Sequence, residues 1–286
     1  MLLASALLLA SLGQAQPYVS PNLGKMVEQS AVILHNLVLE MNKQDLTNMT
    51  ARLESGGALM GGVVRPGQSL AMLRLGPGDD FHYLMAAGSN TNARIAFRVK
   101  DASGKVVREA RTEDASDRIY TTVRESHRSA ANWTYEAVNM AKSGDPIVVT
   151  MMVTRSGSKG QPLIVGDFYK AMVALSTQVK GMTDENWGLM PGQSSVVGGV
   201  VAARSHLTMG PYNMAQDTFV LASSDGKCSD WELFLLRASN GAVLEKDTDT
   251  GDQPFGLVSG QNAVNIKLQN TSGSNSFGCY VVMRTP

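Results

Sequence analysis

The sequence predicts a mainly β protein with two helices, in which two related β-sandwich units each follow an amphipathic helix. Three observations support this fold class: a gapless internal similarity, two segments with the apolar spacing of a helix, and many short segments of alternating polarity between turn residues. With 286 residues, the chain is long enough for two domains of ordinary size.

The internal similarity places residues 61–106 on residues 198–243 at a constant offset of 137, with eleven of 46 positions identical. Ordinary composition would give about three identities in such an alignment. We interpret the similarity as a tandem duplication of jelly-roll-like units. Because most of the shared residues are glycine or apolar, the duplication predicts a common scaffold and does not indicate a chemistry.

The chain begins with an apolar segment, residues 2–12, followed by the small-residue pattern Gly13-Gln14-Ala15. This arrangement is typical of a secretory signal peptide, although no lysine or arginine precedes the apolar run. We therefore expect residues 1–15 to be a signal peptide and the protein to be periplasmic or extracellular. The run is too short to span a bilayer, and we expect no membrane span in the mature chain.

Apolar residues at helical spacing predict a helix near the start of each unit, over residues 24–52 and residues 166–182. A flexible stretch, residues 155–162, separates the units. We expect the first unit to comprise residues 16–157 and the second to comprise residues 158–286.

After each predicted helix, the apolar period changes to two and the segments become short. Residues 70–75 and 95–99 in the first unit, and residues 231–236 in the second, are expected to be hairpin strands. Asn240-Gly241 is a typical hairpin turn, because both residue types accept a positive φ. Each unit ends on a strongly apolar strand, residues 147–153 or residues 279–283.

The charge pattern indicates no nucleic-acid partner. The chain has 25 basic and 25 acidic residues, and the arginines of residues 108–128 alternate with acidic residues. Nucleic-acid binding requires a dominant positive field, which this balanced pattern does not supply. The oligomeric state is left open.

Two cysteines, Cys228 and Cys279, both lie in the second unit. Because an exported chain meets an oxidising compartment, we expect a disulfide between them. Two buried free thiols are the alternative.

One segment has the composition of a calcium loop. Asp247, Asp249 and Asp252 alternate with other residues on a turn beside Gly251, which resembles the way oxygen ligands are presented to Ca²⁺. The spacing departs from an EF-hand, because glycine is fifth and no glutamate is twelfth. We interpret the segment first as a solvated acidic turn and second as a calcium site; no other cofactor is expected.

Three stretches of the first unit resemble the bacterial pre-peptidase C-terminal domain. They are Asp80–Gly88, Phe97–Val106 and Tyr135–Met140, and the second unit repeats the resemblance at Asp217–Phe219, Trp231–Leu236 and Asn240–Asp247. The resemblance implies a jelly-roll-like β-sandwich and a non-catalytic module that binds or targets. The chain departs from that family in the helix before each sandwich and in having no attached catalytic domain.

Motifs for catalysis are missing from the sequence. None of the four histidines has the spacing of a local metal site, and there is no Gly-x-Ser-x-Gly motif and no phosphate-binding glycine loop. Aromatic residues are candidates for stacking on sugar rings, although tryptophan in sandwiches often packs between sheets. The candidates are Trp133, Trp187, Trp231, Tyr212 and Tyr280.

We therefore expect an exported, non-enzymatic tandem β-sandwich protein that binds an envelope polysaccharide or envelope protein. A periplasmic sensor-like ligand-binding domain and an enzyme of unrecognised type are the alternatives. A central sheet with interleaved helices would favour the sensor, and a cleft with convergent ionisable groups would favour the enzyme.

Overall fold

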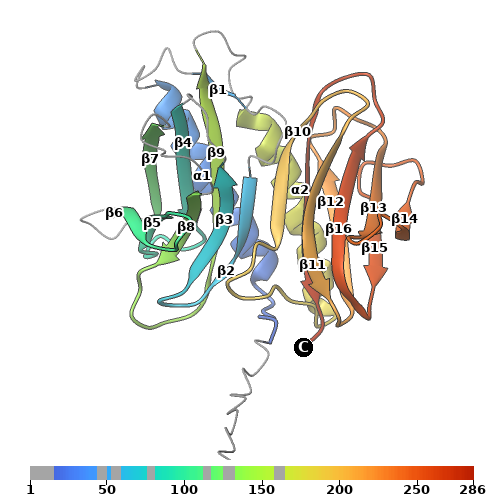
Figure 1. The fold of residues 1–286 in the computed structure, drawn as a ribbon, viewed down its shortest axis with the longest axis horizontal. Coiled ribbons are helices and arrows are strands. Elements are labelled where there is room, and N and C mark those ends of the chain that lie inside the picture. Colours follow the sequence, from blue (N-terminus) through green and yellow to red (C-terminus); the bar gives the residue numbers. More distant parts are fainter. Residues whose placement is uncertain are drawn as a thin grey trace, which may run out of the picture.

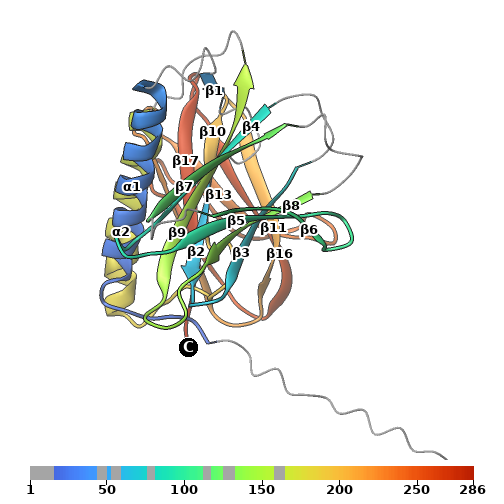
Figure 2. The ribbon, with the colours of Figure 1, turned by 90° about the vertical axis from the view of Figure 1, so that its left-hand side faces the viewer.

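A computed structural model describes residues 16–43, 50–52, 59–75, 81–111, 117–124, 133–157 and 165–286. The predicted signal peptide and residues 158–162 of the predicted linker lie outside these residues. The described chain forms three layers: a pair of helices, a large central sheet, and two smaller sheets side by side (Figure 1, Figure 2). The mainly β fold class with two helices is thus confirmed.

The helices are α1 (Leu23–Lys43) and α2 (Val165–Asp184). Among the described residues, the central sheet has nine strands. Eight of them are neighbours in the order β15 (Phe255–Val258), β12 (Thr218–Ser224), β17 (Ser276–Arg284), β10 (Val196–Val201), β2 (Leu59–Val64), β9 (Ile147–Gly157), β4 (Phe81–Gly88) and β7 (Arg118–Arg124). The ninth, β1 (Thr50–Arg52), makes its only described pairing with β9.

Each smaller sheet has four strands and belongs to one half of the chain. The first half contributes β3 (Ser69–Leu75), β8 (Trp133–Asn139), β5 (Ile95–Lys100) and β6 (Val106–Arg111), in that order. The second contributes β11 (His206–Met214), β16 (Gln261–Asn270), β13 (Trp231–Arg237) and β14 (Val243–Asp247).

The two halves meet at the pairing of β2 with β10, which makes the central sheet continuous. Its antiparallel register pairs Val196 with Gly61, Val197 with Met60, and Gly198 with Leu59. The central pair, Met60 and Val197, occupies equivalent positions at the offset of the internal similarity. The register is therefore the one that a twofold axis at this seam would give. The duplication as an origin of the halves stays a prediction.

The central sheet is buried on both faces, and this explains the uninterrupted apolar strands. Along β17, Phe277, Cys279 and Val281 belong to the core between the sheet and the helices. Tyr280 and Val282 alternate with them and belong to the core between the sheet and the smaller sheets. A strand between two apolar layers needs apolar residues at every position, so its sequence loses the period of two.

Two segments differ from their predicted structure. Residues 50–52, expected at the end of the first helix, form β1, because α1 ends at Lys43 and the backbone of Thr50–Arg52 pairs with β9. Residues 155–157, expected in a flexible linker, are the β9 residues of that pairing. No helix in the described residues has the length and apolar character needed to cross a membrane.

The helices pack side by side and antiparallel (Figure 2). Gly24, near the start of α1, lies against the late α2 residues Ser176 and Lys180, whereas His35 stacks on Tyr169 near the start of α2. A Cβ on Gly24 would lie 2.6 Å from the carbonyl oxygen of Ser176. Glycine is therefore required at this crossing for steric reasons.

Alanine substitution is expected to have opposite effects at two helix glycines. Gly24→Ala should lower the free energy of unfolding by about 1–3 kcal/mol, because the helices must separate. Gly181→Ala in α2 should raise it by about 0.5–1 kcal/mol, because no atom lies within 4 Å and alanine has the higher helix propensity. Urea denaturation of residues 16–286 measures both, and equal signs would contradict the packing of α1 on α2.

Candidate functional site

A groove of about 800 Å³ lies beside α1 in the first half of the molecule. We call it the α1 groove. Its walls come from the start of α1 and the extended segment before it, from the β4–β5 turn, and from the segment leading into β9. The lining residues are Tyr18, Ser20, Asn22, Lys25, Met26, Glu28, Gln29, Val32, Ile33, Ser89, Asn90, Thr91, Asp145, Pro146 and Ile147.

The helix contributes one stripe of side chains to the α1 groove. Lys25, Gln29 and Val32 recur at the spacing of three to four residues that keeps side chains on one helix face. Eight residue steps from Lys25 to Ile33 give this wall a length of about 12 Å. The groove is therefore long enough for an extended ligand rather than a single small group.

The opposite wall is a turn whose shape depends on two polar side chains. Ser89 is buried, and its Oγ accepts a hydrogen bond of 3.0 Å from the backbone N–H of Val148. Asn90 Oδ1 accepts a bond of 2.8 Å from the backbone N–H of Asn92. These bonds fix the turn and leave the Asn90 amide nitrogen, which is exposed, with no recorded partner among the described residues.

The lining of the α1 groove combines neutral polar side chains with apolar ones. Seven lining residues carry amides or hydroxyls, and Met26, Ile33 and Ile147 are among the apolar ones. The charged lining residues are Lys25, Glu28 and Asp145, which leaves a net charge of about −1. This mixture fits a ligand that has many hydrogen-bonding groups and little net charge.

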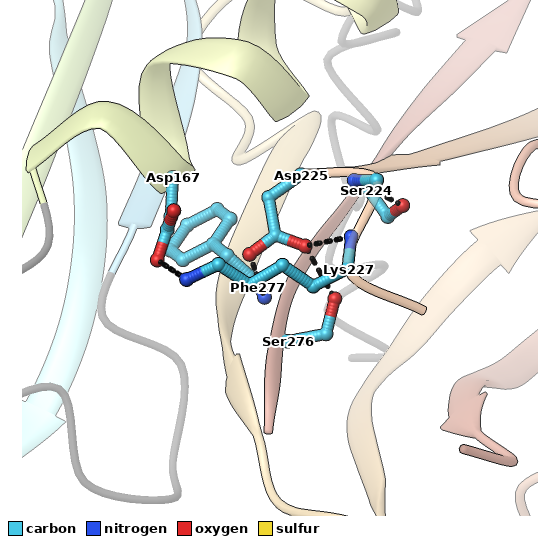
Figure 3. A network of polar contacts seen from close by, with 7 residues as sticks. Asp167, Ser224, Asp225, Lys227, Ser276 and Phe277 are labelled. Carbon is cyan, nitrogen blue, oxygen red and sulfur yellow. Dashed lines mark hydrogen bonds and ion pairs between the residues drawn. The ribbon is translucent and has the colours of Figure 1, made fainter. Parts of the chain in front are cut away.

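The corresponding place in the second half is bridged by an ion pair. Lys227 Nζ, in the β12–β13 loop, lies 2.5 Å from Asp167 Oδ2 in the first turn of α2 (Figure 3). We call this pair the α2 latch. Ser89 and Asp225 occupy the same place in the two halves, because each side chain accepts the backbone N–H of the neighbouring strand, that of Val148 or that of Phe277. Two residues further along, Thr91 is therefore the counterpart of Lys227. Met26 is equivalent to Asp167 when the helices are aligned on their buried residues, so the first half has Met26 and Thr91 where the second has the latch.

Asp225 holds the loop that carries the latch. Its Oδ1 accepts hydrogen bonds from the N–H of Lys227 at 3.0 Å and the hydroxyl of Ser276 at 2.5 Å, and its Oδ2 accepts one from the N–H of Phe277 at 3.0 Å (Figure 3). Both carboxylate oxygens of this buried side chain are thus engaged in fixing the loop. We assign Asp225 a structural role.

The predicted calcium ligands do not form a site. Asp247 uses Oδ1 to accept the N–H of Asp249 at 3.1 Å and Oδ2 to accept the N–H of Phe255 at 3.0 Å. Among the described residues, no group of three or more acidic, histidine or cysteine side chains has the arrangement of a metal site. Asp247 therefore stabilises the turn before β15. The carboxylates of Asp247, Asp249 and Asp252 do not form a cluster that could surround a cation.

The structure also corrects the expected disulfide, because Cys228 and Cys279 are both free and buried. Cys279 faces the helices, whereas Cys228 lies in the core on the other side of the central sheet. The Cys228 thiol donates to the carbonyl oxygen of Asp230 at 2.9 Å. Burial, together with the nearby negative charge of Asp225, raises the pKa of the Cys279 thiol.

Both thiols are expected to be unreactive until the protein unfolds. The thiolate is the reactive form, and both sulfurs are shielded from solvent. Ellman's reagent at neutral pH should therefore detect neither thiol in native protein and both in urea. The variants Cys228→Ala and Cys279→Ala, which each retain one thiol, serve as controls. If the reagent detects no thiol in protein that is unfolded in urea without a reducing agent, the disulfide exists.

The aromatic candidates divide between the interior and the surface. Trp231 and Tyr280 are buried inside the second sandwich, as packing between sheets predicts. Tyr212 contacts Tyr280 through its hydroxyl at 3.1 Å, and burial raises the pKa of both phenols. Trp187 is half-buried next to Phe219. The side chain of Trp133 lies outside the described residues.

A buried arginine lies beside the tyrosine pair. Arg284 donates to Gln193 Oε1 at 3.1 Å and to the carbonyl oxygen of Asn213 at 2.6 Å. Desolvation lowers the pKa of this guanidinium. Because Gln193 belongs to the segment between α2 and β10, Arg284 ties that segment to the second sandwich.

Sequence reasoning missed the α1 groove because its walls come from three separate stretches of the chain. A signal was nevertheless present in the internal similarity. Its gapless offset pairs Lys227 with Asn90, one residue from the structural counterpart Thr91, and neither Asn90 nor Thr91 is charged. A pair of opposite charges in one half therefore has no counterpart in the other. Loss of a matched charge pair marks a place where the halves differ in shape.

No protein-family model and no curated protein matches this chain. The chain is similar to the solved structure of AerE from Microcystis aeruginosa, at 11% identity over 83% of this chain and 92% of that chain, with a TM-score of 0.20. It is similar to the PBSX exported protein XepA, at 11% identity over 82% and 94%, with a TM-score of 0.26. It is also similar to the CBM22-1-CBM22-2 tandem domain of Paenibacillus barcinonensis Xyn10C, at 9% identity over 83% of this chain and 96% of that chain, with a TM-score of 0.23. Likenesses at these TM-scores carry no argument about function.

Proposed function

We propose that this protein is an exported, non-catalytic binding protein that holds a neutral polysaccharide chain of the cell envelope in the α1 groove. The observation that carries the proposal is the lining of this groove. Amide, hydroxyl and apolar side chains line it together, along a helix wall of about 12 Å. A polysaccharide matches both the polar and the apolar side chains, since its sugar rings present hydroxyls at their edges and C–H groups on their faces.

The charges of the α1 groove support a neutral ligand. The lining contains Lys25, Glu28 and Asp145, so an acidic polysaccharide would meet one more negative charge than positive. Nucleic acid is disfavoured for the same reason. Binding is therefore expected to change little between low and high salt.

Two further observations support binding without catalysis. Asp225, the buried acid of the latch loop, has both carboxylate oxygens engaged by backbone and hydroxyl donors. The shifted pKa values of Tyr280 and Cys279 arise in the packed second half, away from the groove. Export rests on the sequence alone, through the apolar residues 2–12 and the small-residue pattern that follows.

A glycan array followed by calorimetry on residues 16–286 tests the proposal. We expect retention of neutral polysaccharides, and about tenfold weaker binding after the double change Gln29→Ala and Asn90→Ala, since each lost hydrogen bond is worth about 0.5–1.5 kcal/mol. Asn36→Ala is the matched control, because Asn36 is exposed on α1 outside the groove lining. Capture of an envelope protein without any glycan, or turnover of the bound glycan, would contradict the proposal.

A further inference from the structure

A row of aromatic side chains lies at the edge of the central sheet in the second half. Trp187 meets Phe219 edge to face, with ring centroids 5.5 Å apart. Phe219 in turn stacks on Phe255, with ring centroids 5.8 Å apart and an interplanar angle of 15°. Phe255 is 54% exposed and the neighbouring Leu257 is 50% exposed. We call Trp187, Phe219 and Phe255, together with the adjoining Leu257, the aromatic row.

The aromatic row is exposed because α2 does not extend over the edge strand. The helix packs on β12 and β17, whereas β15 lies one strand further out. Gly256 of β15 turns toward the core, where a Cβ would lie 3.2 Å from Leu235, so Phe255 and Leu257 take the opposite face. Because the backbone at Gly256 lies against the smaller sheet, the side chains on the other face of β15, Phe255 and Leu257, are left facing solvent.

The other edge of the same sheet carries an exposed ring and a charged residue together. Tyr120 of β7 is the counterpart of Phe255, because Met85 and Leu221, which occupy the same place in β4 and β12, pair with Tyr120 and Phe255. Tyr120 is 49% exposed, and two residues before it Arg118 forms an ion pair of 3.4 Å with Glu40 of α1. A charged residue is the usual protection of a sheet edge against unwanted contacts. No residue of β15 is charged, so the edge of the second half has the exposed ring without this protection.

A backbone-paired segment connects the α1 groove with the aromatic row. Tyr18, which lines the groove, pairs with Leu189 through backbone hydrogen bonds of 2.8 and 3.1 Å. Leu189 is two residues after Trp187, and Val19 is in contact range of Gly188. The Tyr18 end of the groove and the Trp187 end of the row are therefore joined by a short, backbone-paired segment.

We infer that the aromatic row continues the polysaccharide site, so that one long chain occupies the α1 groove and then stacks its sugar rings on Phe255 and Trp187. This inference rests on the proposed function. Flat, exposed rings offer the apolar faces that such stacking requires. The side-chain amide of Gln253, two residues before Phe255, can bond sugar hydroxyls. Its orientation is fixed, since its Oε1 accepts a hydrogen bond of 3.1 Å from Gln178 Nε2. The row itself contains no charged residue, which favours an uncharged ligand over a charged protein surface.

Chain length provides the test, because only a long ligand reaches both surfaces. We would titrate residues 16–286 with a chito-oligosaccharide series from disaccharide to octasaccharide, following calorimetry and the emission of Trp187. The octasaccharide should bind about tenfold more tightly than the tetrasaccharide, since the second contact is intramolecular. Phe255→Ala should abolish this gain and leave tetrasaccharide affinity unchanged. Trp187→Phe identifies the fluorescence change as that of Trp187.

Tyr120→Ala is the matched control, because Tyr120 is 49% exposed on β7 at the opposite edge of the sheet. It should leave the gain with chain length intact. The inference is overturned if Phe255→Ala keeps the gain, or if sedimentation shows a dimer that Phe255→Ala dissociates, which would make the row a contact between copies. Failure to bind any glycan would overturn the proposed function as well. One further outcome separates the two sites. If the octasaccharide still binds the double variant Gln29→Ala with Asn90→Ala but no longer binds Phe255→Ala, the aromatic row is a glycan site and the α1 groove is not.

Discussion

Gly278→Ala is expected to cost about 3 kcal/mol or more of the free energy of unfolding, which is at the upper end of the cost of overpacking a core. Gly278 is in the middle of β17, and a Cβ there would lie 2.6, 2.8 and 3.0 Å from three ring atoms of Trp231. Trp231 is only 1% exposed between the sheets, so its ring has no open space into which to move. Urea denaturation followed by circular dichroism measures the loss.

A double-mutant cycle separates this clash from other effects of alanine. Trp231→Phe removes the ring atoms closest to Gly278, so Gly278→Ala should cost less in that background than in the natural protein. Gly273→Ala is the matched control, because no atom lies within 4 Å of a Cβ at that turn position. Additive losses in the double variant would show that contact with Trp231 is not the cause.

Transfer of the α2 latch to the first half is expected to close the α1 groove and weaken polysaccharide binding at least about tenfold. The change is Met26→Asp together with Thr91→Lys, which places the charges of Asp167 and Lys227 at the corresponding positions. The new ion pair would cross the groove between α1 and the β4–β5 turn, where the ligand is proposed to lie. Calorimetry with the best neutral glycan from the array measures the loss.

Salt and the second half supply the controls for this transfer. Because the new pair is partly exposed, high salt should weaken it and restore part of the binding, whereas each single change should have a smaller effect that does not depend on salt in this way. Asp167→Met with Lys227→Thr opens the α2 latch and should leave glycan affinity unchanged. Undiminished binding by the closed variant would refute the α1 groove as the site.

Local patterns of the sequence predicted both helices and part of the strands. Val27, Ala31 and Leu34 have helical spacing and all face the central sheet, and the same holds for Phe168, Met172 and Leu175. Alternation and turn residues located β3, β5 and β13, because side chains of a strand point to opposite faces and hairpin turns require particular φ values. Gly241 indeed has a φ of +72°. The apolar runs located β9 and β17.

Pairing between distant segments lay beyond these patterns. The seam between β2 and β10, which makes one sheet of the two halves, depends on which strand edges meet, and a local pattern does not contain that information. The expected disulfide failed for a related reason. Cys228 and Cys279 both flank strands of the same half, but the pleat directs Cys279 to the helices while the loop places Cys228 on the other face.

Composition, charge and periodicity thus determined by themselves that this is a mainly β protein with two amphipathic helices and internally similar halves. Tertiary structure alone decided where a ligand has room. The α1 groove unites side chains from residues 18–33, 89–91 and 145–147, and the aromatic row depends on α2 ending its cover one strand before β15. Local conformation follows from interactions between near neighbours, whereas a binding surface is made where packing leaves side chains from distant segments together and uncovered.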